Sequence, residues 1–272
     1  MANSWFRFKQ FTVHQDRCAM KVGTDGALLG ALAPVPLKGK ILDIGTGTGV
    51  VALMLAQRSD VEIDAVEIDA VEVDEGAARQ AAENIRDSPW SDRIQVIHAD
   101  FRDFYQSWKN RYDVIVSNPP YFRHSLRSEL PEKALARHAE EDFHKDLLAG
   151  SVLLLSPSGR CCFILPPEGA ALMEVVAHEM GMVVRSRVDV YSKAGGKLIR
   201  QVITLERNDA GTDRDVRPET DSYMRGLHPS GRFSSGVYTF PVLAERQLVI
   251  YENNGEYTME FRELMRSFYL NI

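Results

Sequence analysis

The residues best suited to chemistry lie in the stretch VIVSNPPYF, residues 114–122. Its apolar start is typical of a strand buried on both faces, and two consecutive prolines must end that strand because they lack N–H donors and fix φ. Asn118 and Tyr121 therefore lie at a carboxyl strand end, where open α/β sheets bind ligands. The Asn118 amide and the rigidly held Pro119 carbonyl can both accept from one amino group, and Tyr121 offers a flat ring. A Pro-Pro turn that only ends a strand is the simpler alternative.

A second candidate site is DIGTGTG, residues 43–49, between a strand pattern and a helical pattern. Gly45, Gly47 and Gly49 let the backbone approach a ligand closely, and the next helix offers unpaired N–H groups. Dinucleotide sites space their glycines as G-x-G-x-x-G, and the acidic Asp43 would repel a pyrophosphate while suiting a cationic amino acid. A dehydrogenase is therefore disfavoured, and a glycine-rich turn without ligand is the alternative. The arrangement resembles the first motif of class I S-adenosylmethionine (SAM) methyltransferases, whose loop packs against the methionine portion of the cofactor.

A carboxylate at the end of the next strand would complete such a site by binding the ribose hydroxyls. The stretch VEIDAVEIDAVEVD, residues 61–74, repeats every five residues, so Glu67 and Glu72 both qualify. Because five is odd, a shift by one repeat turns every side chain to the other face, and only one register is correct. The helix expected to begin near Glu75 favours Glu72, with Glu67 as the reserve candidate.

Asp100 and Phe101 follow the third predicted strand. Asp100 can accept a hydrogen bond from the adenine amino group of SAM, and Phe101 can cover that base. A solvated turn aspartate is the alternative, but the position at a carboxyl strand end favours the ligand role.

The motif of residues 118–121 looks like the Asn-Pro-Pro-Tyr motif of class I amino-methyltransferases, which act on adenine N6, cytosine N4, guanine N2 or glutamine amides. Two acceptors on one NH₂ group would pull its lone pair out of conjugation and aim it at the sulfonium methyl group. The nitrogen can lose its proton after the methyl group arrives, so no strong general base is required. We expect the chemistry to be mostly positioning.

Short apolar runs alternate with helical patterns from Lys40 onward. Strands are predicted at residues 41–44, within 63–73, and at 94–98, 112–117, 161–165, 183–190, 198–206 and 248–251; helices are predicted at 50–57, 75–86, 142–155 and 169–180, with another carrying Phe261 and Phe268. This order indicates a mostly parallel sheet with helices on both faces. The resemblance implies a Rossmann-like α/β fold of seven strands, including an antiparallel closing strand.

The same patterns divide the chain into four parts. They are an N-terminal extension (1–39) that contributes to the site, a methyltransferase core (40–207), an insertion or mobile arm (208–247), and a strand-turn-helix (248–272) packed on the core. The segment 208–247 is polar, weakly periodic and too long for an ordinary connection.

The N-terminal segment indicates which group of amino-methyltransferases the chain resembles. Residues 6–34, FRFKQFTVHQDRCAMKVGTDGALLGALAP, closely resemble the bacterial tRNA (adenine-N6) methyltransferases that modify valine tRNA at adenosine 37, beside the anticodon. Residues 54–60, 81–94 and 255–270 are similar to the same family. The resemblance implies that Lys21, Thr24 and Asp25 border the methionine end of SAM.

The expected site residues fall into two sets. The expected cofactor-binding residues are Lys21, Thr24, Asp25, Asp43, Gly45, Thr46, Gly47, Gly49, Glu72, Asp100, Phe101 and Asn118. The expected catalytic residues are Asn118, Pro119, Pro120 and Tyr121.

The net charge of −6 argues against a protein coated in basic surface, so a tRNA partner requires a local basic patch. Candidates are Arg7 and Lys9 among Phe6, Phe8 and Phe11; Arg123, His124 and Arg127; and Lys193, Lys197 and Arg200. Basic and aromatic mixtures suit phosphate contacts and base stacking. Each of these residues is equally compatible with solvated surface, and the aromatic side chains can simply pack.

The three cysteines, Cys18, Cys161 and Cys162, have no metal-ligand spacing and fit reduced core residues of a cytoplasmic protein. His138 and His144 form no close helical pair, so we expect no metal. No signal peptide and no apolar stretch of membrane-spanning length are evident, and a monomer is favoured.

Two other functions remain open from the sequence. Glutamine methylation of a protein release factor uses the same four-residue motif, but a separate helical N-terminal domain would be expected there. A non-catalytic SAM-binding or tRNA-binding scaffold would bind the cofactor without turnover.

Overall fold

The computed structural model describes residues 3–59, 66–109, 111–121, 130–208 and 244–272. One sheet contains the strands β3 (Lys40–Ile44), β4 (Glu67–Glu72), β5 (Ile94–His98), β6 (Tyr112–Ser117), β7 (Leu155–Leu165), β8 (Met182–Lys193), β9 (Leu198–Arg207) and β10 (Ala244–Tyr251). The helices are α1 (Thr24–Leu32), α2 (Val50–Arg58), α3 (Glu75–Arg86), α4 (Phe101–Ser107), α5 (Leu130–Leu154), α6 (Pro167–Glu179) and α8 (Met259–Met265). A separate hairpin pairs β1 (Trp5–Arg7) with β2 (Thr12–His14).

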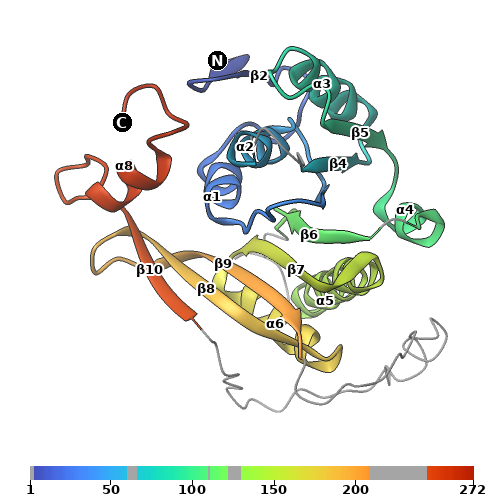
Figure 1. Cartoon of the computed structure of the whole chain (residues 1–272). Coiled ribbons are helices and arrows are strands. Elements are labelled where there is room, and N and C mark those ends of the chain that lie inside the picture. The colour runs from blue at the N-terminus through green and yellow to red at the C-terminus, as the bar shows by residue number, and fades with distance from the viewer. Residues whose placement is uncertain (1–2, 60–65, 110, 122–129, 209–243) are drawn as a thin grey trace.

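The sheet has the strand order β10-β8-β9-β7-β6-β3-β4-β5, with helices on both faces (Figure 1). The strands β3, β4, β5, β6 and β7 are parallel to one another, whereas β9 is antiparallel to both β7 and β8. The predicted class, a mostly parallel Rossmann-like sheet with an antiparallel closing strand, is therefore confirmed.

The predicted number of seven strands is wrong for the described part of the chain, where the sheet has eight. The extra strand is β10, which pairs in parallel with β8 at the edge of the sheet. An edge strand presents unpaired N–H and C=O groups that any suitably placed extended segment can satisfy. The sequence predicts that residues 248–251 form a strand, but no local pattern indicates which strand of the sheet they pair with.

Alternating side chains of the central strands divide the core between the two faces of the sheet. In β6, Val114 and Val116 pack with the cluster under α1 and α2, whereas Ile115 packs with the cluster under α5 and α6. This two-sided burial explains why the strands are continuous apolar runs instead of alternating patterns.

Several helix boundaries differ from the predicted ones. The helix expected at 142–155 begins earlier, at Leu130. The sequence does not predict its first half, LPEKALARHAEED, because that stretch has few apolar residues and little helical periodicity. Leu155 already belongs to β7, whose first residues include proline and glycine and therefore look like a turn in the sequence.

The helix α1 lies in the segment 1–39, where the sequence patterns predict no helix. Its two glycines weaken the helical signal, but Gly30 is required by packing: a Cβ there would lie 2.8 Å from the Cβ and Sδ atoms of Met54 in α2. The Arg58 guanidinium at the end of α2 donates to the Gly30 and Ala33 carbonyl oxygens, at 2.9 and 2.7 Å. The N-terminal helix is thus attached to the core.

The topology brings the chemically interesting segments to one edge of the sheet. The carboxyl ends of β3, β4, β5, β6 and β7 share that edge because these strands are parallel. The amino end of β9 lies there too, since β9 runs antiparallel and pairs Gln201 with Leu165 at the end of β7. The predicted arm 208–247 falls almost entirely on residues 209–243, outside the described residues.

Candidate functional site

The glycine loop between β3 and α2 has left-handed backbone at all three glycines, with φ of 70° at Gly45, 57° at Gly47 and 81° at Gly49. Other residues rarely adopt these angles, which explains the alternate glycines. A Cβ at Gly45 or Gly47 would meet nothing within 4 Å, whereas at Gly49 it would meet Ala81 and Ile85 of α3 at 3.5 Å. The first two glycines therefore line open space, and the third packs against a helix.

The backbone N–H groups of this loop are largely used within the protein. Those of Gly45 and Thr46 donate to the Val71 carbonyl oxygen at 2.8 and 3.1 Å, and that of Gly49 donates to the Thr46 carbonyl oxygen at 2.9 Å. The Gly47 N–H donates to Glu72 Oε2 at 2.8 Å. A loop whose donors are engaged in this way suits close packing against a ligand better than binding of a pyrophosphate.

Glu72 lies at the carboxyl end of β4, and its side chain is buried beside the glycine loop. Its second oxygen, Oε1, accepts a hydrogen bond from the Asp74 N–H at 3.0 Å. Glu67 lies at the opposite end of the same strand, exposed, with its carboxylate 2.5 Å from Lys40 Nζ. Of the two acidic candidates, the structure therefore places Glu72 at the loop.

Asp43 is 1% exposed and lies beneath the loop. Its Oδ2 accepts a hydrogen bond from the Thr46 hydroxyl at 2.6 Å. Burial raises the pKa of Asp43 to about 7 and the charge of Glu72 acts in the same direction, whereas hydrogen bonds from Thr46 and the Ala52 backbone oppose the shift. The contacts of this carboxyl group thus connect the loop to the start of α2.

Asp100 is exposed and serves as the N-cap of α4, where its Oδ1 accepts from the Arg102 N–H at 2.7 Å. Phe101 is half-buried and contacts the ring of Tyr105, with 5.3 Å between ring centroids. The structure gives Asp100 a capping contact and leaves its predicted contact with an adenine base as a prediction.

The residues Asn118 to Tyr121 directly follow β6, the sheet neighbour of β3. The Ser117 hydroxyl donates to the Ile44 carbonyl oxygen at 2.8 Å, so the two strand ends that precede the predicted catalytic and glycine loops are joined. The Tyr121 hydroxyl donates to Asn118 Oδ1 at 2.6 Å and lies 3.3 Å from the Ile164 carbonyl oxygen. Pro119 is buried, whereas Pro120 is exposed.

Arg200, at the start of β9, contacts this loop. Its guanidinium carbon lies over the Tyr121 ring, 4.8 Å from the centroid, and its Nε lies 2.8 Å from Asp25 Oδ2. Burial raises the pKa of the Tyr121 hydroxyl and the charge of Asp25 adds to this shift, whereas Arg200 opposes it. Tyr121 therefore stays protonated, and a hydrogen-bond donor, at neutral pH.

The segment before α1 crosses the same edge of the sheet. Arg17, near its start, bonds to Glu83 of α3 at 2.8 Å, and Met20 Sδ lies 3.9 Å from the Asn118 amide nitrogen. Lys21 Nζ donates to the Gln15 and Cys18 carbonyl oxygens, the latter at 2.9 Å, and so fixes the segment's fold. Thr24 is exposed at the first position of α1.

Comparison with known proteins gives the family. Residues 18–154 match the family model described as Methyltransferase small domain. A protein of Bacteroides thetaiotaomicron named tRNA1(Val) (adenine(37)-N6)-methyltransferase is 40% identical over 100% of both chains, and one of the same name from Serratia proteamaculans is 40% identical over 97% of this chain and 89% of its own. The chain belongs to this methyltransferase family.

Solved structures show that the fold is that of class I methyltransferases. A predicted O-methyltransferase from Agrobacterium tumefaciens has a TM-score of 0.59 at 16% identity, covering 92% of this chain and 100% of its own. TrmN from Thermus thermophilus has a TM-score of 0.50 at 24% identity, covering 67% of this chain and 48% of its own. These likenesses concern the fold alone.

The sequence patterns do not predict the contacts that Arg200 and Met20 make with the loop of residues 118–121. The sequence indicates Arg200 only as a candidate phosphate contact, and Met20 is not among the predicted site residues of this methyltransferase. The order of strands could have pointed to Arg200, because the amino end of an antiparallel β9 must lie beside the carboxyl end of β7. Nothing in the local sequence points to Met20.

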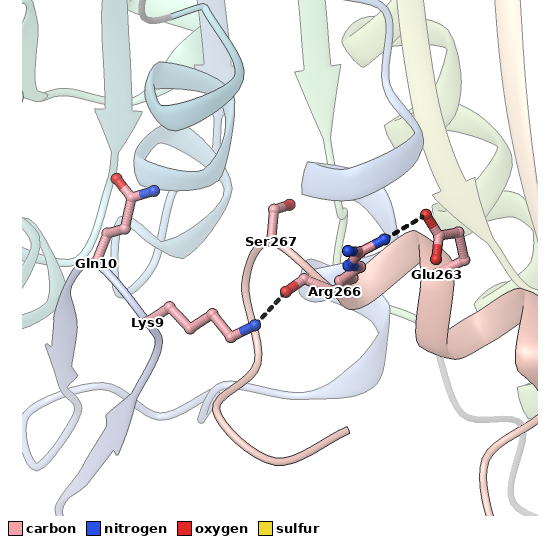
Figure 2. A pocket seen from close by; sticks show the side chains of 5 residues that line it. All are labelled: Lys9, Gln10, Glu263, Arg266 and Ser267. Carbon is pink, nitrogen blue, oxygen red and sulfur yellow. Dashed lines mark hydrogen bonds and ion pairs between the residues drawn. The ribbon is translucent and has the colours of Figure 1, made fainter.

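The aromatic residues near the N-terminus mostly pack. Phe8 and Phe11 are buried and stacked, with 4.5 Å between ring centroids, so they are unavailable for stacking on bases. Lys9 borders a groove of about 450 Å³ lined also by Gln10, Glu263, Arg266 and Ser267. Figure 2 shows the Lys9 amine directed at the Arg266 carbonyl oxygen, 2.5 Å away, across the junction of N- and C-terminal segments. No residue of the glycine or Asn118 loops lines this groove.

The remaining basic candidates divide into two groups. Lys193 and Lys197 are exposed at the β8–β9 turn, on the sheet edge that carries the site. Arg123, His124 and Arg127 lie outside the described residues.

Among the side chains that the structure describes, no group of three or more His, Cys, Asp or Glu could hold a metal ion. In the same residues no helix has the length and apolarity needed to cross a membrane.

Proposed function

We propose that this protein transfers a methyl group from SAM to the exocyclic N6 of an adenosine in tRNA. One observation carries the proposal: the Asn118 motif directly follows the end of β6, which is joined to the end of β3, where the glycine loop begins and Gly45 and Gly47 line open space. The family membership supplies the reaction and substrate class, since its named members are tRNA adenine-N6 methyltransferases.

The residues of the glycine site fit SAM. The open space beside Gly45 and Gly47 leaves room for a ligand packed against the backbone, which a Cβ would fill. Each oxygen of Glu72 accepts one backbone N–H bond and retains a lone pair for a ribose hydroxyl. When bound, SAM supplies an electrophilic methyl group on its sulfonium sulfur.

The chain's own contribution at the Asn118 loop is to hold the target amino group. Asn118 Oδ1 and the Pro119 carbonyl oxygen accept its two N–H bonds, and the Tyr121 ring supports the purine. This arrangement turns the nitrogen lone pair toward the methyl donor, and the nitrogen loses its proton after transfer. Positioning of this kind can account for a large share of the rate enhancement.

The finer parts of the proposal concern the substrate and the other segments. We propose that the target is adenosine 37 of valine tRNA, the site named for the relatives. Residues 1–39 would contribute to the site through the segment that carries Met20, Lys21 and Asp25. The protein would act as a monomer in the cytoplasm, where its proposed tRNA substrate is found.

The test is incubation with methyl-labelled SAM and separate pools of tRNA, rRNA, DNA and protein, followed by nucleoside digestion. The expected result is N6-methyladenosine from the tRNA pool, with tRNA lacking A37 as the matched negative control. Label in protein alone would replace the proposal by glutamine methylation. Binding of SAM without label in any pool would replace the proposal by a non-catalytic scaffold function.

A further inference from the structure

A chain of contacts runs from α1 to the catalytic loop through Arg200. Asp25 Oδ2 lies 2.8 Å from Arg200 Nε, the Arg200 guanidinium carbon lies 4.8 Å from the centroid of the Tyr121 ring, and the Tyr121 hydroxyl donates to Asn118 Oδ1 at 2.6 Å. The four residues come from α1, β9 and the loop after β6, so only the folded protein assembles them.

The ion pair at the start of this chain of contacts is shielded. The Arg200 and Asp25 side chains are 28% and 26% exposed, and Arg200 Nη1 also donates to the Ile199 carbonyl oxygen at 2.6 Å. Exposed ion pairs contribute little and leave their side chains mobile, whereas a shielded guanidinium with two partners has a fixed orientation. Arg200 thus presents a fixed planar cation to the tyrosine ring, an arrangement that arginine makes better than lysine.

The last contact determines which end of the Asn118 amide meets the substrate. An asparagine amide can rotate to exchange its oxygen and its NH₂ group, and only the oxygen can accept from a substrate amino group. The Tyr121 hydroxyl donates to Oδ1 at 2.6 Å and the amide nitrogen faces Met20 Sδ at 3.9 Å, so these contacts favour the rotamer with Oδ1 in its present place. That oxygen has a second lone pair for the substrate.

We propose that Arg200 is a positioning residue for methyl transfer: held by Asp25, it fixes Tyr121, which in turn fixes the Asn118 amide. Arg200 acts through Tyr121 and not as a phosphate contact on the tRNA surface. This inference rests on the proposed function, and it adds a residue outside the Asn118–Tyr121 motif to the same site.

The test is a double-mutant cycle with Arg200→Ala, Tyr121→Phe and both together. The measurement is the single-turnover rate of methyl transfer to unmodified tRNA, with SAM and tRNA both saturating. A misplaced acceptor group should slow transfer about 10- to 100-fold in Arg200→Ala. The double variant should be no slower than the slower single variant, because both changes remove the same contact path.

The controls separate positioning from general damage. Arg187→Ala removes another shielded arginine, on β8, which pairs with Glu174 at 2.5 Å and Glu245 at 3.0 Å, and it should leave the rate unchanged. Arg200→Lys should recover part of the rate, since it keeps the charge but not the planar group. If Arg200→Ala does not fold, Arg200→Gln, which keeps most of the side-chain volume, takes its place in the cycle.

The outcomes are distinguishable. Additive effects in the cycle would overturn the inference, as would an Arg200→Ala variant that keeps the saturated rate and only needs more tRNA. The second result would make Arg200 a substrate phosphate contact. Both leave the proposed function intact, whereas absence of transfer by the unmodified protein would overturn the proposed function and this inference together.

Discussion

Glu72 Oε2, at the end of β4, accepts a hydrogen bond of 2.8 Å from the Gly47 N–H, in the loop after β3. This contact orders the glycine loop through a neighbouring strand of the sheet. The same carboxylate also accepts from the Asp74 N–H at the start of α3. One side chain therefore connects the glycine loop to the start of α3.

Glu72→Gln should weaken SAM binding about tenfold or more, because hydrogen bonds to a charged group contribute roughly 1.5–3 kcal/mol. Glu67→Gln is the matched control: it changes the same residue type on the same strand, but at the exposed, opposite end. It should alter affinity by less than about twofold, as expected for an exposed pair. Isothermal titration with SAM measures both, and equal losses would refute the assignment of Glu72.

Gly47→Ala should impair SAM binding more than it impairs folding. The residue has φ of 57° and a new Cβ would point into open space at the proposed site. Gly181→Ala is the control, since its φ is 70° and its Cβ would also meet nothing within 4 Å, but it lies at the end of α6, on the opposite sheet edge. Each should lower the unfolding free energy by about 1 kcal/mol. Comparable SAM affinity in both variants would contradict the proposed site.

Asn118→Ala should abolish methyl transfer and leave SAM affinity nearly unchanged, because the proposed role of the amide oxygen is to hold the target amino group. Transfer to tRNA and SAM titration are measured on the same preparation. Asn254→Ala, in the turn after β10, is the control, since its Oδ1 accepts from the Glu256 N–H within that turn at 3.0 Å. Loss of SAM binding in Asn118→Ala would show that the loop is misplaced.

Asp43 should make stability depend on pH. Burial raises its pKa from the ordinary 3.8 to about 7, so the folded protein binds this proton more tightly than the unfolded chain. The resulting stabilisation is complete below about pH 4 and is lost as the pH rises to about 7.

The Asp43→Asn variant has no titrating group at this position. Comparison with it therefore isolates the contribution of Asp43 to the pH dependence of stability. The stability advantage of the unmodified protein over Asp43→Asn should shrink between pH 5 and 7, by at most about 1.4 kcal/mol per pH unit. Urea unfolding of both proteins across this range measures it. An advantage that grows with pH would mean that Asp43 is charged in the folded protein.

Much of the fold follows from local patterns. The apolar runs around Ile41, Ile115 and Phe163 predict buried strands, and the helical patterns between them predict parallel pairing. The same patterns predict where each strand stops, and so which polar residues gather at one edge. Glu72 is favoured over Glu67 because the pattern of α3 begins three residues later.

Local patterns also explain which elements the sequence does not predict. The short helix α4 is one of them, because it depends on a cap at Asp100 and has too few turns to show a period. The start of β7 carries Pro157 and Gly159, which are typical of turns, yet Gly159 lies close to Tyr112 and Leu155, where a Cβ would have no room. Packing against neighbours overrides the residues' own preferences at such positions.

The sequence by itself determined the chemistry on offer: an Asn-Pro-Pro-Tyr loop and a glycine loop at strand ends, because turn residues and apolar periods are local. Only the tertiary structure decided the partners of those residues. Asp25 and Arg200 are 175 positions apart, and they meet because β9 runs antiparallel beside β7 while α1 packs against the same end of the sheet. Strand order and direction arise from the packing of the whole chain, so no local pattern encodes that contact.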